Sequence, residues 1–177
     1  LFCMFIASVL KDTVTTYVEP EKVIQELNRR FNQLHIENQL VQYYFTAIYL
    51  VVDTKYKRID YVNAGHPPGL FFTDQDDVVR LGTTAPPVGL FDRIDMESKS
   101  FHYEGDAHLV LYTDGLLEAV EGDQDVQLQF LIDELAGHHH LDKGEIERMF
   151  FEVGVPSDRD DDKCLVWISL HEGTDSA

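Results

Sequence analysis

The chain has 177 residues, of which 44% are hydrophobic and 11% aromatic, with 14 Lys and Arg against 32 Asp and Glu. This length and apolar content predict one domain over residues 1–177 and exclude intrinsic disorder. The net charge of −18 repels phosphate backbones and anionic lipid, so we expect no nucleic-acid and no membrane-surface partner. Small cations, or a protein partner with a basic rim, fit this charge better.

Cys3 and Cys164 lie near opposite ends of the chain, without the spacing of a zinc site or a redox pair. This pattern indicates a reducing compartment, and we expect a cytoplasmic protein. The apolar residues 1–10 are too few to span a membrane and lack the flanks of a signal peptide, so they predict a core helix. Because the chain opens directly on this run, we expect it to be cut from a longer protein.

Two amphipathic helices are expected first, one ending near Tyr17 and the next beginning at Pro20. Their apolar stripes are Phe2, Phe5, Ile6, Val9 and Thr13, and then Ile24, Leu27, Phe31 and Leu34. Residues 43–53 and 58–63 are rich in β-branched and aromatic side chains and predict an antiparallel hairpin. Short strands are expected at 70–73, 78–81 and 96–103. The Gly- and Pro-rich segment 64–69 must be irregular, because proline cannot donate to a ladder.

Residues 109–112 and 164–170 are continuously apolar, which is typical of strands that are buried on both faces. Helices are expected at 116–120, around 128–135 and around 146–153. Since helices flank a block of mostly antiparallel strands, we expect the α+β class, with layered sheets and helices.

Acidic residues adjoin both of these apolar strands. Asp114 follows the first strand, and the run 160–162 precedes the second. If the two strands are antiparallel neighbours, these carboxylates converge, and a divalent cation would relieve their repulsion. Oxygen ligands favour magnesium, manganese or calcium. The alternatives are a turn with an acidic helix start at 113–115 and a solvated loop at 160–162.

Other chemistry is weakly supported. Adjacent side chains of His138, His139 and His140 point in different directions, which disfavours zinc. His66, between glycine and prolines, is interpreted as an orienting loop residue rather than an acid or base. The cysteine-phosphatase, GxSxG, Walker and GxGxxG motifs do not occur in the sequence.

Four segments in order, 45–49 (FTAIY), 61–68 (YVNAGHPP), 111–119 (LYTDGLLEA) and the pair 161–162, resemble the SpoIIE/RsbU-type PPM (protein phosphatase 2C-like) serine/threonine phosphatases. The resemblance implies an α-β-β-α sandwich of two mostly antiparallel sheets flanked by helices. It also implies two Mn²⁺ or Mg²⁺ ions at one sheet edge, which activate a water that attacks a phosphoserine or phosphothreonine.

The resemblance also assigns residues. Asp114 matches the ligand of the Thr-Asp-Gly motif, and Asp161 matches the first residue of the acidic pair, with Asp162 as the other choice. Thr113, Gly115, Gly65 and His66 belong to the same motifs as supporting residues.

Two departures from the family pattern stand out. Cys164 replaces the usual threonine, and the family's Asp-x-x-Gly-His-Gly segment, which carries a bridging carboxylate and a histidine near the leaving group, does not occur in this sequence. His66 belongs to another motif and does not replace that histidine. For this chain alone we therefore expect an incomplete site, weak metal binding and little or no activity.

In such proteins the phosphatase is the output of an upstream sensory or receiver domain in sigma-factor regulation. The resemblance implies a phosphorylated STAS-type anti-anti-sigma protein as substrate, and a helix pair, residues 1–36, through which an upstream module or a homodimer partner adjusts the metal site. The alternative is a catalytically inactive PPM-like domain that binds a partner.

Overall fold

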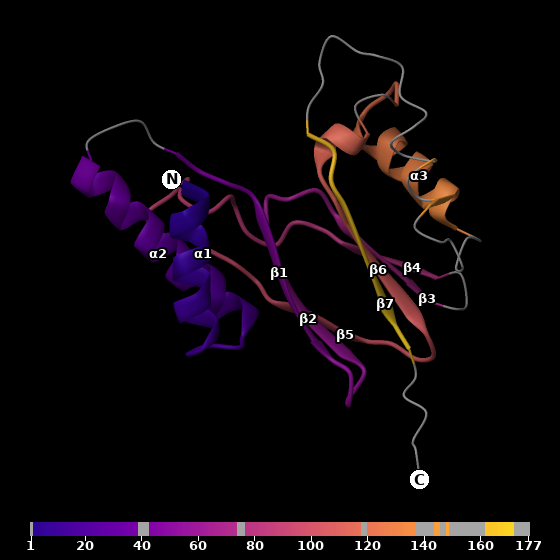
Figure 1. Ribbon diagram of the computed structural model, residues 1–177, viewed down its shortest axis with the longest axis horizontal. Coiled ribbons are helices and arrows are strands. Elements are labelled where there is room, and N and C mark those ends of the chain that lie inside the picture. The colour runs from indigo at the N-terminus through magenta and orange to yellow at the C-terminus, as the bar shows by residue number, and fades with distance from the viewer. Residues whose placement is uncertain are drawn as a thin grey trace. The chain divides into compact units, whose positions relative to one another are not determined.

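The computed structural model describes residues 2–38, 43–73, 77–117, 120–136, 144–145, 148 and 162–171. The chain divides into two compact units, residues 1–68 with 81–103 and residues 69–80 with 104–177. The strands form one three-stranded and one four-stranded sheet (Figure 1). Helices and antiparallel pairing in this pattern confirm the predicted α+β class. That residues 1–177 form a single domain stays a prediction.

The first unit contains helices α1 (Phe2–Val14) and α2 (Pro20–Asn38). Helix α1 ends earlier than expected, because the Thr13 carbonyl accepts the N–H groups of Thr16 and Tyr17 in a closing turn. Apolar side chains of α2 pack against the sheet as the predicted stripe requires. The buried cluster contains Val9, Val23, Ile24, Leu27, Phe31, Val62, Ala64, Ala85 and Val88. The side chains of Phe2, Phe5 and Leu34 lie outside the described part.

In the sheet of this unit, β1 (Ala47–Asp53) and β2 (Arg58–Ala64) form the predicted antiparallel hairpin. The second pair joins β2 to β5 (Lys99–His102), also antiparallel. The prediction that the first strand begins at residue 43 is wrong by four residues. Phe45 is instead bridged to Val88, with N···O distances of 3.0 and 2.9 Å, and this contact draws the chain away from β2.

The second unit contains β3 (Gly69–Thr73), β4 (Val78–Leu81), β6 (Ala107–Tyr112), β7 (Leu165–Leu170) and helix α3 (Gln124–Leu135), with the sheet order β4-β3-β6-β7. Leu128, Leu131 and Leu135 of α3 share a buried cluster with residues of β3 and β6. The Asp123 carboxylate caps α3 by accepting the Val126 N–H at 3.0 Å. The three histidines at 138–140 lie outside the described residues. The helix expected around 146–153 also lies outside them, apart from residue 148.

Two sequence-based expectations for this unit need correction. Where a helix was expected at 116–120, a single 3₁₀ turn, η1 (Asp114–Leu116), follows β6, and Leu117 and Val120 are not helical. Residues 118–119 lie outside the described residues. The strand at 164–170 was expected to be buried, yet Val166 is 44% exposed and its neighbours are half-exposed or exposed. The reason is that β7 has a single strand neighbour among the described residues, whereas β6 lies between two strands and buries Leu109 and Val110 fully.

Among the described residues, no helix combines the length and the apolar character that crossing a membrane requires.

Candidate metal centre

The pairing of β6 with β7 places the two predicted acidic segments at one end of the sheet. The two strands lie side by side (Figure 1) and are antiparallel. Tyr112 lies opposite Leu165 as the last pair before the acidic segments. Beyond this pair, the Thr113 N–H still donates to the Cys164 carbonyl at 3.0 Å. The premise that the end of one strand lies beside the start of the other is therefore confirmed.

Asp114 is held by its main chain at the point where β6 turns into η1. The Thr113 carbonyl accepts the Leu116 N–H at 3.0 Å, and the Asp114 carbonyl accepts the Leu117 N–H at 2.9 Å. One carboxylate oxygen of Asp114 accepts the Gly115 N–H at 3.1 Å, while the residue as a whole is exposed and Gly115 is buried. A strand end thus presents this carboxylate to solvent from a fixed backbone.

Asp162 reaches the same place through its main chain. The main-chain carbonyl of Asp162 accepts a hydrogen bond from the Thr113 hydroxyl at 2.9 Å, and Asp162 is exposed. Asp161 lies outside the described residues. The choice between Asp161 and Asp162 as ligand therefore stays a prediction, as do the ligand roles themselves.

The donor chemistry of these residues suits a hard divalent cation. Carboxylate oxygens on two adjacent strand ends are the ligands that magnesium and manganese take in proteins. Within the described ranges, no group of three or more His, Cys, Asp or Glu side chains is arranged to hold an ion. The carboxylates at the two strand ends thus suit a divalent ion in their chemistry.

Tyr112 adjoins the site as the last residue of β6. Burial raises the pKa of Tyr112 to about 12, although the positive charge of Arg80 acts in the opposite direction. Its hydroxyl is therefore protonated at neutral pH and cannot serve as a general base.

Gly65 and His66 belong to the first unit and are described there. Gly65 has a φ of +72°, and an added Cβ would lie 2.7 Å from Cγ of Pro87, so the loop requires glycine here. The His66 N–H donates to Oδ1 of Asn63 at 2.8 Å, and its Nδ1 lies 3.4 Å from the Thr46 hydroxyl. These bonds hold His66 within its loop.

Sequence reasoning gave no role to Asn63, which the structure places at the centre of this loop. Its side chain is fully buried, and its amide nitrogen donates to the Leu81 carbonyl at 2.9 Å. The main-chain carbonyl of Asn63 accepts the N–H groups of Thr84 and Ala85 at 2.8 and 3.0 Å. The sequence offered one sign of this structural role: Asn63 is a polar residue within the otherwise apolar run that precedes Gly65.

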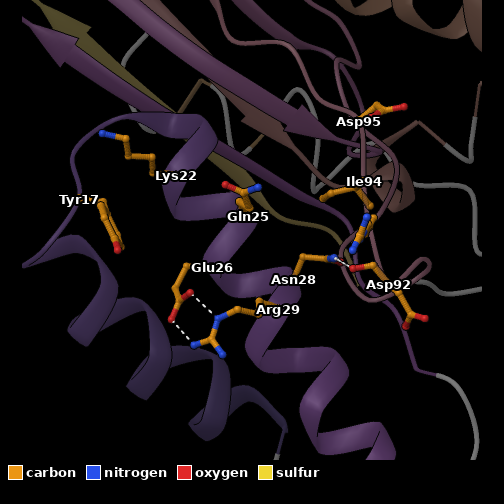
Figure 2. A pocket seen from close by; sticks show the side chains of 10 residues that line it. Tyr17, Lys22, Gln25, Glu26, Asn28, Arg29, Asp92, Ile94 and Asp95 are labelled. Atoms are coloured by element: carbon orange, nitrogen blue, oxygen red, sulfur yellow. Dashed lines mark hydrogen bonds and ion pairs between the residues drawn. The ribbon is translucent and has the colours of Figure 1, made fainter.

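A second asparagine, Asn28 on α2, was also missed. It is 3% exposed; its Oδ1 accepts the Gly89 N–H at 2.8 Å, and its Nδ2 donates to the Phe91 carbonyl at 3.1 Å. Beside it, an open groove of about 730 Å³ lies between α2 and residues 92–95 (Figure 2). None of the predicted site residues lines this groove.

The model of the family described as Stage II sporulation protein E (SpoIIE) matches residues 1–171. The chain belongs to the SpoIIE family. A curated relative, phosphoserine phosphatase RsbP of Bacillus subtilis (strain 168), is 39% identical over 118 residues, which are 67% of this chain and 29% of RsbP. The chain thus spans less than a third of the length of that relative.

Solved structures of SpoIIE from Bacillus subtilis share the fold. The PP2C phosphatase domain with a fragment of the regulatory domain matches with a TM-score of 0.70 and 16% identity, over 93% of this chain and 49% of that chain. The Mn-presoaked phosphatase domain matches with a TM-score of 0.59 and 17% identity, over 95% and 73% of the two chains. The expected PP2C-like phosphatase fold of the SpoIIE/RsbU type is therefore confirmed.

Proposed function

We propose that this SpoIIE-family chain provides the metal-binding strand ends of a protein serine/threonine phosphatase. The observation that carries the proposal is the pairing of β6 with β7, which brings Asp114 and residue 162 to one end of one sheet. Asp114, together with Asp161 or Asp162, would hold Mn²⁺ or Mg²⁺, two ions in the intact family site. The manganese-presoaked SpoIIE structure is consistent with this choice of ion.

When bound, such ions polarise phosphoryl oxygens and favour deprotonation of an attacking water. The chain's own contribution is to fix the ligands. The 3₁₀ turn holds the backbone of Asp114, and the contacts of Thr113 hold residues 162–164 beside it. Because Asp114 is exposed, the substrate phosphate can approach it from solvent.

The proposed substrate is a phosphoserine or phosphothreonine on a regulatory protein, specifically a STAS-type anti-anti-sigma protein. The curated relative that is 39% identical is a phosphoserine phosphatase, which supports the phosphoserine class. An upstream sensory or receiver domain, acting directly or through a homodimer, would control the activity. The charge of −18 favours a substrate whose docking face is basic.

The test is Mn²⁺ binding by isothermal titration calorimetry to the wild-type chain and to D114N. We expect D114N to abolish binding, because the amide removes one of the anionic ligands. D123N is the matched control. It removes one charge in the same unit, and asparagine still caps α3, so its Mn²⁺ affinity should equal that of the wild type.

Activity is tested on a phosphoserine peptide with a form of the protein in which the family's Asp-x-x-Gly-His-Gly segment precedes residue 1. We expect Mn²⁺-dependent phosphate release that D114N eliminates. If D114N retains the wild-type rate, the assignment of Asp114 is wrong. If metal binds but no phosphate is released, the chain is the inactive, partner-binding PPM-like domain instead.

A further inference from the structure

Thr113 lies where β6 ends, and its main chain leaves the ladder there. Its carbonyl accepts the Leu116 N–H at 3.0 Å and so begins η1. The register of β6 and β7 places Cys164 opposite Thr113, and the Thr113 N–H does donate to the Cys164 carbonyl. In a regular antiparallel pair of this kind the Thr113 carbonyl would accept the Cys164 N–H in return. Here that carbonyl is engaged elsewhere.

The Thr113 hydroxyl takes the place of the diverted carbonyl. It accepts the Cys164 N–H at 2.9 Å, and it donates its own proton to the Asp162 carbonyl, also at 2.9 Å. Together with the main-chain bond, three hydrogen bonds join Thr113 to residues 162–164. The chain can therefore turn sharply at Asp114 while the start of β7 stays attached.

Building on the metal site proposed above, we propose that Thr113 is a positioning residue, whose hydroxyl sets the spacing between Asp114 and Asp162. Asp114 is its neighbour in the chain, and Asp162 supplies the carbonyl that its hydroxyl binds. Groups that orient metal ligands without touching the metal typically contribute 10- to 100-fold to metal affinity. The Thr113 hydroxyl has this role toward both strand ends at once.

Only a hydroxyl can both accept and donate in this geometry, which makes the proposal specific. Valine has nearly the shape of threonine and suits the extended backbone of Thr113, whose φ and ψ are −89° and 154°, but it can form neither bond. Serine keeps the hydroxyl and loses the methyl group. The pair T113V and T113S therefore separates hydrogen bonding from side-chain packing.

The experiment measures the Mn²⁺ affinity of the 177-residue chain by isothermal titration calorimetry, and the amide hydrogen exchange of Cys164 by NMR without metal. We expect T113V to weaken Mn²⁺ binding by about tenfold or more, and T113S to stay near the wild type. Exchange at Cys164 should accelerate in T113V only. T73V is the matched control, since Thr73 ends β3 and its hydroxyl has no hydrogen bond to another described residue.

The outcomes separate this proposal from the proposed metal site. If D114N abolishes Mn²⁺ binding but T113V binds like the wild type, only the role of Thr113 is overturned. If D114N also binds like the wild type, the metal site is wrong and the role of Thr113 falls with it. If T113V does not fold, T113S and the wild type decide. A rapidly exchanging Cys164 amide in the wild type, or Mn²⁺ binding by T113S that is about tenfold weaker than that of the wild type, overturns the proposal.

Discussion

Gly89 occupies a position that a larger residue cannot take. Its φ is +86°, and an added Cβ would lie 2.5 Å from a ring carbon of Phe31 and 2.9 Å from the Tyr43 carbonyl oxygen. We expect G89A to lower the free energy of unfolding by at least about 1 kcal/mol, measured by urea denaturation, since the left-handed conformation alone costs that much.

The control for this prediction is G82A. A Cβ at Gly82 meets no atom within 4 Å, so its effect should stay within about 0.5 kcal/mol. If G82A and G89A lower the free energy of unfolding equally, the steric requirement for glycine at position 89 is wrong.

Thr13 on α1 is 1% exposed, and its hydroxyl has no hydrogen-bond partner in the described structure. A buried hydroxyl without a partner costs about 1–3 kcal/mol in desolvation, which valine avoids at nearly equal volume. We expect T13V to raise the melting temperature in a thermal scan. T15V is the comparison, because the exposed Thr15 hydroxyl donates to the Asp12 carbonyl at 2.7 Å, and losing that bond should bring no gain.

Single residues also show where sequence reasoning stops. Asp114 could be assigned because it follows an apolar strand directly. Asn28 and Asn63 could not, because their partners lie far along the chain: 61 residues separate Asn28 from Gly89, and 18 separate Asn63 from Leu81. A buried asparagine and a surface asparagine look alike until the loops that they bind are known.

At the scale of elements, helix α2 carries an ion cluster with a defined pH dependence. Figure 2 shows Arg29 bound to the Glu26 carboxylate. Hydrogen bonds from Arg29, and then from Arg30, outweigh desolvation and lower the pKa of Glu26 to about 2 from an ordinary value of 4.5. A carboxyl with a lowered pKa stabilises the fold above its unfolded value, and the contribution is lost as the pH falls through the folded value. The sensitive window is therefore about pH 4.5 to 2.

We expect E26Q to lower the free energy of unfolding by less than about 1 kcal/mol at pH 7, because pairs of this kind are worth about 0.3–0.5 kcal/mol each. The difference from the wild type should shrink as the pH approaches 2. Urea unfolding of E26Q and of the wild type at several pH values measures this difference in free energy. A difference that stays constant down to pH 2 would show that the charge of Glu26 is not the cause.

The sequence predicted which segments form strands better than it predicted how deeply those strands are buried. The hairpin of β1 and β2 follows from β-branched composition and a short connection, and its pairing is confirmed. The apolar run at 164–170 is a strand, but its composition cannot reveal that it has one strand neighbour rather than two. A helix was expected at 116–120, but among its described residues Leu116 ends a 3₁₀ turn, because so short an apolar segment does not separate a 3₁₀ turn from an α-helix.

At the scale of the whole molecule, the net charge of −18 opposes the folded state by self-repulsion. Raising NaCl from about 0.01 to about 1 M shortens the Debye length from about 30 to about 3 Å, so we expect the melting temperature at pH 7 to rise. Near the isoelectric point of about 4.6, the same salt series should have a much smaller effect. A salt response that is equal at both pH values would point to a cause other than charge.

The convergence of distant acidic segments was the part of the site that sequence alone could predict. It needed only two apolar strands that pair antiparallel, and that pairing is confirmed. Whether Asp161 or Asp162 would bind the proposed metal ion could not be predicted, because both residues precede the same strand and carry the same carboxylate chemistry.

Two asparagines on α2, Asn28 and Asn32, have a mechanical consequence. Asn28 and Asn32 together bind the main chain of Gly89, Phe91 and Asp92. The helix therefore cannot slide along its axis and leave residues 89–92 in place: either these bonds rupture, or the segment is dragged with it. The same stretch of chain is anchored a few residues earlier to Asn63, so any such displacement strains the loop that carries His66.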